Sequence, residues 1–154
     1  MPHFEAVTSL SQPIAEVFDF LSRPANLIEV TPPEFNLRLV EGPEQLFLGA
    51  RVVFQARRWG FAQRMVSEVT AFEPDHLLVD EQREGPFPKW IHSHRLEPVP
   101  GGTQMTDRTD FEPPGGMLGF LLTTDAVLGE LQDMFAYRER RLKELLAGEG
   151  ASES

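Results

Sequence analysis

The segment between residues 35 and 112 constrains the fold most strongly, because it has the pattern of six consecutive β-strands. Glycine and proline clusters separate the segments, and these residues are typical of turns rather than of strand interiors. Several turns are only a few residues long, so neighbouring strands should pair as antiparallel hairpins. A sheet of this kind buries one face, which another element must cover. The predicted strands are residues 35–40, 50–59, 61–72, 76–84, 89–98 and 103–112.

A long amphipathic helix near the C-terminus is the predicted cover for that face. Residues 113–116, two prolines and two glycines, end the last strand. Apolar residues then recur at helical spacing, namely Leu121, Leu128, Leu131, Phe135, Leu142, Leu145 and Leu146. The opposite face is predicted to carry Glu130, Asp133, Arg138, Glu139, Arg141 and Glu144. Gly129 falls inside the helix at a cost near 1 kcal/mol relative to alanine. We expect it to permit close packing or to widen a space beneath the helix.

The N-terminal part adds one strand and two short helices. Residues 3–9 alternate in polarity, as a strand does. Ser11 and Pro13 then predict a helix start, with Ser11 near the N-cap. The helix that follows has one apolar face, made by Ile14, Val17, Phe18 and Leu21. A second short helix begins near Pro24 and ends before the two prolines at positions 32 and 33.

This element order predicts an α+β fold in one domain, residues 3–147. A curved antiparallel sheet of six or seven strands should wrap around the long C-terminal helix, with two short helices after the first strand. Where inward side chains are not bulky enough, a space remains between sheet and helix, and a ligand would bind there. Residues 148–154 are rich in glycine, serine and glutamate, which predicts a disordered tail.

Composition excludes several classes of function. The chain has 154 residues and no cysteine, so disulfides, thiolate nucleophiles and thiolate-bound metals are ruled out. Its 24 acidic and 14 basic side chains give a net charge of −10, which argues against a nucleic-acid partner. The N-terminus lacks the regions of a signal peptide, and no apolar run approaches the roughly 20 residues of a membrane span. We therefore expect a cytoplasmic protein without a membrane span. The oligomeric state is not indicated.

The strand predicted at residues 89–98 contains the most informative polar residues. Alternate residues of a strand share a face, so Trp90, His92 and His94 point the same way. Their neighbours on the other face are almost all polar, which places the indole and both imidazoles inside. In the strand at residues 103–112, Met105 and Phe111 select the inward face, and Asp107 shares it. An inward carboxylate there can pair with either histidine.

The strand at residues 76–84 offers two choices, because its apolar residues do not select a face. Asp80 and Gln82 lie on one side, and Glu81 and Arg83 on the other. Three interpretations of the whole polar cluster stay open. It is a structural hydrogen-bond network, the polar end of an otherwise apolar pocket, or a metal or acid–base site. No cofactor is predicted, and a metal ion bound to this cluster would be an adventitious one.

The remaining candidates are weaker. Arg23 follows the first helix, where it would pack its stem on the surface, close the entrance of a pocket or bind an anionic ligand. The run from Arg57 to Trp59 is predicted to be a hairpin end with solvated charges. Five apolar residues are assigned to the core or the pocket wall, namely Phe54, Met65, Leu128, Leu131 and Phe135.

Several segments of the chain also resemble a known superfamily. These segments are residues 21–27, 31–33, 80–82, 85–94 and 101–107. Together with the element order, they resemble the START-related helix-grip superfamily, often abbreviated SRPBCC, and within it a group of small bacterial ligand-binding, polyketide cyclase-like proteins. The resemblance covers most of residues 3–146. It implies a helix-grip fold with a cavity, and it favours Asp80 and Gln82 on the inner face. It implies no particular reaction.

Three functions are consistent with these patterns. The leading hypothesis is a protein that binds a small apolar or amphipathic molecule between the sheet and the C-terminal helix. Its polar and aromatic contacts would be Trp90, His92, His94 and Asp107, with Asp80 and Gln82 behind them. The second is an enzyme of the cyclase, dehydratase or hydrolase kind, in which His92 or His94 acts as base and Asp107 orients it. The third is a protein-interaction module, which would show an exposed apolar patch instead of an enclosed cavity.

Overall fold

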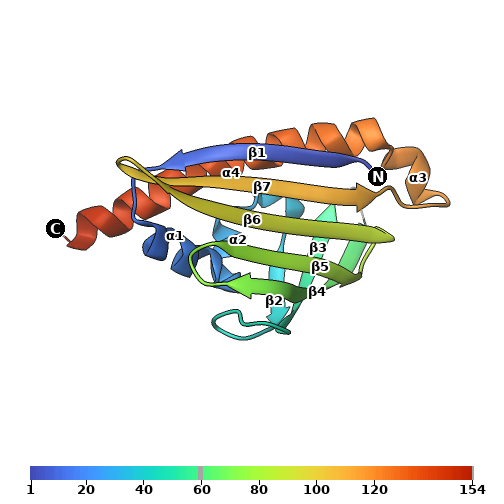
Figure 1. The fold of residues 1–154 in the computed structure, drawn as a ribbon. Coiled ribbons are helices and arrows are strands. Elements are labelled where there is room, and N and C mark those ends of the chain that lie inside the picture. Colours follow the sequence, from blue (N-terminus) through green and yellow to red (C-terminus); the bar gives the residue numbers. More distant parts are fainter. Residues whose placement is uncertain (59–60, 154) are drawn as a thin grey trace.

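One curved antiparallel sheet forms the body of the protein (Figure 1). The computed structural model describes residues 1–58 and 61–153 of the chain. Over these residues the sheet has seven strands in the order β1-β7-β6-β5-β4-β3-β2. The strands are β1 (His3–Leu10), β2 (Arg38–Glu41), β3 (Arg51–Arg58), β4 (Phe61–Glu73), β5 (Leu77–Glu84), β6 (Lys89–Val99) and β7 (Gly102–Glu112). Because β1 pairs with β7, the two edge strands of the sheet are β1 and β2.

The predicted meander is confirmed, with one strand displaced. The segment expected at residues 35–40 becomes a strand only at Arg38. Ahead of it, Pro33–Phe35 form a short 3-10 helix, η1, which closes at Asn36 in the left-handed conformation. The two prolines at 32 and 33 cannot donate backbone hydrogen bonds to a neighbouring strand, so the chain turns there instead. At the β3–β4 hairpin Arg57 is exposed, as expected, and Trp59 lies outside the described residues.

Two short helices follow β1, as predicted. Helix α1 spans Ile14–Leu21 and α2 spans Pro24–Glu29. Pro13 precedes α1 as its N-cap residue and has an extended backbone, and no side chain caps the helix. The assignment of Ser11 to the N-cap is therefore wrong. The proline ring already holds the backbone dihedral that a helix start needs. Both helices lie below β1 at the end of the sheet where the C-terminal half of the long helix passes (Figure 1).

The C-terminal helical region is divided into two elements. Helix α3 spans Leu118–Leu121, and the long helix α4 begins at Thr124 and ends at Glu153. The Thr123 hydroxyl accepts a hydrogen bond from the backbone N–H of Ala126, at 3.2 Å, and so caps α4. Leu121 was predicted to lie on the buried face of the long helix. It belongs instead to α3, and its side chain is exposed.

The domain limits 3–147 and the disordered tail predicted for residues 148–154 stay predictions. In the described part of the chain, no helix is long and apolar enough to cross a membrane.

Two groups of buried side chains hold α4 and the short helices against the sheet. One group joins α1 to the C-terminal half of α4, through Val17, Phe18, Leu142 and Leu146. The other joins the N-terminal half of α4 to β7, through Leu131, Phe135 and Phe111. Phe4 of β1 stacks on Phe135, with ring centroids 5.5 Å apart. Burial of these side chains is the main source of stability, and the space between the two groups is where the cavity lies.

Candidate functional site

A cavity of about 320 Å³ lies between the concave face of the sheet and α4. Its wall is built mostly from apolar side chains, because inward positions of the strands and one stripe of α4 meet there. Helix α4 and strand β4 contribute the most lining residues, and β3, β5, β6 and α2 contribute further ones. Representative lining residues are Leu27, Val52, Phe54, Met65, Val69, Leu78, Val127, Leu131, Met134 and Phe135.

Four of the five predicted apolar residues line this cavity, and one does not. Phe54, Met65, Leu131 and Phe135 are in the wall. Among the described side chains, Leu128 packs instead against the core group that contains Phe111, outside the cavity wall.

The polar end of the cavity is centred on one buried carboxylate. Asp107 is 1% exposed, and its Oδ1 atom lies 3.0 Å from His92 Nε2, which donates a hydrogen bond to it. The same oxygen is 2.6 Å from His94 Nδ1, out of line for a hydrogen bond, so this contact is electrostatic. Residues 94 and 107 are direct partners in the β6–β7 ladder. The alternation of β6 and β7 therefore brings the three side chains together, as the sequence predicts.

The histidines, but not Asp107, form part of the cavity wall. The two imidazole rings lie with centroids 4.0 Å apart and cover the carboxylate. Asp107 was predicted to contact a ligand directly. In the structure it lies behind the histidines and positions them instead.

Electrostatics keep this group of three side chains in a defined charge state. Burial alone would raise the pKa of Asp107, but His94 and His92 outweigh it and hold the pKa well below its ordinary value. Burial also lowers the pKa of His92 from its ordinary 6.5, and the neighbouring His94 adds to this effect. The hydrogen bond to Asp107 opposes the shift of His92 without cancelling it. A carboxylate next to a neutral His92 is the state that these shifts favour near neutral pH.

Asp80 and Gln82 face the cavity, which settles the choice that the alternation of β5 left open. Asp80 lies opposite His92 in the β5–β6 ladder and accepts a hydrogen bond from the Ser67 hydroxyl at 3.0 Å. Gln82 accepts one from the backbone N–H of Phe87 at 3.1 Å. A Cβ atom at Gly85 would collide with the Gln82 side chain, so this turn needs glycine.

Trp90 lies in the wall within an aromatic group next to the hairpin loop. Its ring centroid is 4.6 Å from that of Phe87 and 5.8 Å from that of Phe111. Both Phe87 and Trp90 line the cavity. The loop at residues 85–88 therefore closes one end of the cavity with apolar rings.

Arg138 is the residue of the site that the sequence analysis placed wrongly. It was predicted on the solvent face of the long helix, but it is 6% exposed and lines the cavity. Its guanidinium lies over the Phe135 ring, 4.8 Å from the centroid. The helical spacing contained the signal, because positions 131, 135, 138 and 142 form one continuous stripe. Assigning every charged residue to the outer face concealed it.

Arg23 lines the cavity near α2, where acidic side chains already engage it. It forms ion pairs with Asp19 at 3.2 Å and with Glu44 at 3.8 Å. The hydrogen bond and charge of Asp19 raise its pKa. A guanidinium held by two carboxylates at the surface is less suited to capture an anionic ligand than to border the opening.

Three side chains at the polar end have the donor types of a metal site. Asp80, His92 and His94 each offer a ligand atom, and these atoms lie within 4.8 Å of one another. Asp107 would then orient the histidines from behind, as carboxylates behind metal-bound histidines do. The buried positive charge of Arg138 on the same wall works against a cation.

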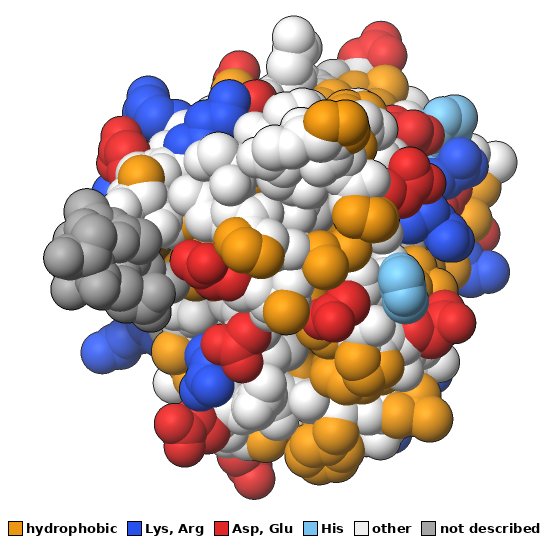
Figure 2. Space-filling model, turned by 60° about the vertical axis from the view of Figure 1, so that its left-hand side comes forward, with side chains coloured by type: hydrophobic (Ala, Val, Ile, Leu, Met, Phe, Trp, Pro, Cys, Tyr) orange, Lys and Arg blue, Asp and Glu red, His pale blue; other side chains and the backbone are white. Residues whose placement is uncertain are grey.

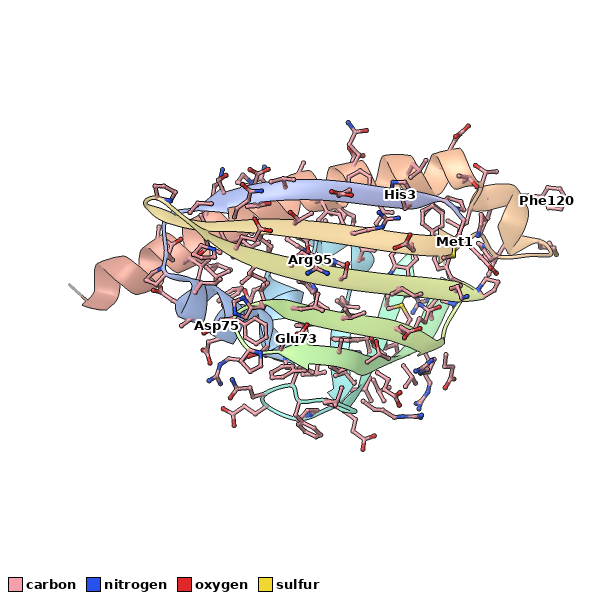
Figure 3. The ribbon with its side chains drawn as sticks, in the orientation of Figure 1. Met1, His3, Glu73, Asp75, Arg95 and Phe120 are labelled. Atoms are coloured by element: carbon pink, nitrogen blue, oxygen red, sulfur yellow. The ribbon has the colours of Figure 1, made fainter. Side chains whose placement is uncertain are left out.

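Exposed apolar side chains are distributed over the surface rather than gathered in one patch. On the face shown in Figure 2, apolar groups alternate with acidic and basic ones. The largest local group is on and beside α3, where Met117, Phe120 and Leu121 are exposed. Figure 3 shows Phe120 pointing away from the body of the protein. The cavity is therefore the more developed feature of this fold.

Comparison with known proteins supports the same architecture. The family model described as polyketide cyclase / dehydrase and lipid transport matches residues 10–138. The fold is similar to that of protein CV1439 from Chromobacterium violaceum, with a TM-score of 0.75, 15% identity and coverage of 95% of this chain and 98% of the other. Protein NE0264 from Nitrosomonas europaea has a TM-score of 0.70 and 16% identity, over 97% and 96% of the two chains.

Ara h 8.0201 has the same fold, with a TM-score of 0.65 and 14% identity, over 96% of this chain and 98% of that one. No curated protein matches the sequence. At these identities the solved structures establish the fold alone. The match to the family model extends from Leu10, the last residue of β1, to Arg138, and so includes strands β2 to β7 and the cavity wall.

Proposed function

The chain belongs to the polyketide cyclase / dehydrase and lipid transport family, and from this premise we propose that it binds a small, mostly apolar molecule between the sheet and α4. The observation that carries the proposal is the cavity of about 320 Å³ with apolar walls and one polar end. Its volume lies at the lower end of the range for small-molecule sites, roughly 300–1,000 Å³. A molecule of one to three rings, or a short chain, suits this space.

Affinity would come mainly from apolar burial. Each apolar Å² removed from water contributes about 25 cal/mol, and such surface is offered by Phe54 and Met65 on the sheet and by Leu131 on α4. The polar end would then orient the ligand. Because Asp107 fixes the position of His92, that side chain meets a ligand in one defined arrangement.

An enzyme of the cyclase, dehydratase or hydrolase kind is the second candidate. The observation that favours it is the hydrogen bond between His92, which lies on the cavity wall, and the buried carboxylate of Asp107 behind it. A neutral imidazole held in this way is suited to accept a proton from a bound substrate. The lowered pKa of His92 keeps its basic form available at neutral pH.

Native mass spectrometry of gently purified protein tests the proposal first. Retained ligand appears as a mass excess over the denatured protein, whereas a single bound metal ion adds a much smaller mass. Titration with the neutral fluorescent probe 1-aminoanthracene then measures the cavity directly. If the protein carries no ligand and does not bind this probe, the binding proposal is wrong.

Two histidine variants separate the binder from the enzyme. His92→Gln and His94→Gln should weaken probe binding only modestly if the protein is a binder. In an enzyme they should abolish turnover of the retained ligand while leaving it bound. His76→Gln is the matched control, because that histidine is exposed and outside the cavity wall. If both variants lower only the melting temperature, the cluster is structural. The absence of a nucleic-acid partner and the cytoplasmic location stay predictions.

A further inference from the structure

The guanidinium of Arg138 has far fewer partners than a buried guanidinium needs. Within the described chain, its only hydrogen bond is a long one, from Nη2 to the Met134 sulfur at 3.7 Å. Its Nε atom is buried without any partner. No carboxylate of the described residues lies within ion-pair distance of it. One aromatic ring, that of Phe135, supplies the remaining contact.

This arrangement is costly unless something else completes it. A guanidinium has five N–H donors, and an unsatisfied buried donor costs about 1–3 kcal/mol, or more when it is charged. Burial accordingly lowers the pKa of Arg138, although not enough for arginine to lose its proton. Because Arg138 forms part of the cavity wall, a molecule in the cavity can reach the guanidinium and accept hydrogen bonds from it.

The surrounding charges select among possible acceptors. Asp107 and Asp80 both act electrostatically on Arg138, without touching it. They also lie at the same end of the cavity as the two histidines. A ligand carboxylate would bring a third negative charge into this apolar enclosure, and both aspartates would repel it. An uncharged carbonyl oxygen accepts the same hydrogen bonds without adding charge.

We propose that Arg138 binds the carbonyl oxygen of an uncharged, otherwise apolar ligand. This inference rests on the proposed binding function and adds the ligand class and its orientation. Phe135 links Arg138 to the polar end, because its ring also meets His92 edge-on at 5.5 Å. The carbonyl end therefore lies toward Arg138 and His92, and the apolar remainder lies toward Phe54 and Met65.

Three naphthalene probes of nearly equal shape test the proposal. These are 2-acetylnaphthalene, 2-isopropylnaphthalene and 2-naphthoate, each measured by displacement of 1-aminoanthracene. The ketone should bind about tenfold more tightly than the isopropyl compound, because one hydrogen bond from a charged donor strengthens binding by about that factor. The naphthoate should bind more weakly than the ketone.

Arg138→Met keeps an unbranched apolar stem and removes the donors. This variant should bind the ketone at most about twofold more tightly than 2-isopropylnaphthalene. Its affinity for 2-isopropylnaphthalene should equal that of the wild type. Loss of a poorly paired buried charge should not unfold the protein. Arg140→Met is the matched control: Arg140 is also on α4 and over an aromatic ring, Tyr137, but it is exposed. This variant should keep the full preference.

The outcomes distinguish the role of Arg138 from the binding function of the cavity. If 1-aminoanthracene binds but the wild-type protein treats the ketone and the isopropyl compound alike, the role of Arg138 is wrong and the cavity function stands. Tightest binding of 2-naphthoate, lost in Arg138→Met, would show that the guanidinium selects an anion and would overturn the carbonyl assignment. Failure of 1-aminoanthracene itself to bind would overturn both. Even if neither variant folds, the wild-type comparison can still overturn the role of Arg138.

Discussion

A single carboxylate oxygen determines the arrangement of the polar end. Asp107 Oδ1 contacts both His92 and His94, from a position that is almost completely buried. Removing an ionised carboxylate from water is unfavourable, so the two imidazoles must compensate. The stability of the fold should therefore depend on the protonation of Asp107 and His92.

Stability is expected to fall as the pH drops from 7.5 to 5. The pKa of His92 is lower in the folded protein than its ordinary 6.5, so the unfolded chain binds more protons in this range. Linkage then requires that acid favours unfolding. Below about pH 3.8 Asp107 adds a second loss, because its folded pKa is also depressed. Urea unfolding at pH 7.5, 6 and 5 measures the first effect.

His92→Gln identifies the group responsible for the first effect. Glutamine can still donate a hydrogen bond to Asp107 but does not titrate, so the pH dependence between 7.5 and 5 should become flatter. His76→Gln, at an exposed site, should leave the wild-type slope unchanged. A variant at position 92 that keeps the full slope would show that another group controls stability here.

At this scale, strand alternation predicted more of the site than residue type did. Trp90, His92 and His94 were placed inside because the opposite face of β6 is polar, and the structure confirms this. Asp107 followed Met105 and Phe111 to the inner face of β7. Arg138 was missed because charged side chains are rarely buried, a rule that fails where a cavity can supply a partner.

At the scale of elements, hydrophobic periodicity predicted the strands well and the helix ends less well. The strands from β3 to β7 lie within two residues of their predicted limits, because glycine and proline turns define them. The separation of α3 from α4 was not predicted. It depends on the backbone at Leu122 and on the Thr123 cap, and apolar spacing alone does not report either feature.

Gly129 provides an element-scale prediction about α4. The glycine was expected to allow close packing or to widen a space, but a Cβ atom there would meet nothing within 4 Å. Gly129→Ala should therefore stabilise the protein by about 0.5–1 kcal/mol, because alanine restricts the unfolded chain and favours helix. For a domain of this size the melting temperature should rise by about 1–4 °C.

Gly119→Ala is the contrasting variant in the neighbouring helix α3. A Cβ atom there would lie 2.6 Å from the backbone oxygen of Pro114, so the substitution should lower the melting temperature. Thermal unfolding followed by circular dichroism compares both variants with the wild type. If Gly129→Ala is also less stable than the wild type, the N-terminal half of α4 is not a regular exposed helix surface.

For the whole molecule, the cavity results from the mismatch between a curved sheet and a straight helix. The strands contribute inward side chains of very different size, from Ala56 to Phe54 on β3. The sequence could predict that a space lies between sheet and helix, since no other element is large enough to cover the face of the sheet. It could not predict the volume, which depends on how the side chains of α4 and β3–β4 pack together.

Occupancy of this cavity should stabilise the whole fold. A ligand at ten times its dissociation constant adds about 1.4 kcal/mol to the free energy of unfolding. The melting temperature should then rise by about 3–6 °C in a domain of this size. Thermal unfolding in the presence of 1-aminoanthracene measures this shift directly.

Filling the cavity should remove that shift without removing the fold. Ala56 is the smallest side chain in the wall on β3, so Ala56→Trp puts a large ring into the space that a ligand would occupy. Added apolar contacts offset the local strain, so the melting temperature without probe should stay near the wild-type value. Ala62→Trp is the control, because Ala62 is exposed on the neighbouring strand β4. If 1-aminoanthracene raises the melting temperature of Ala56→Trp as much as that of the wild type, the probe binds elsewhere and the cavity is not its binding site.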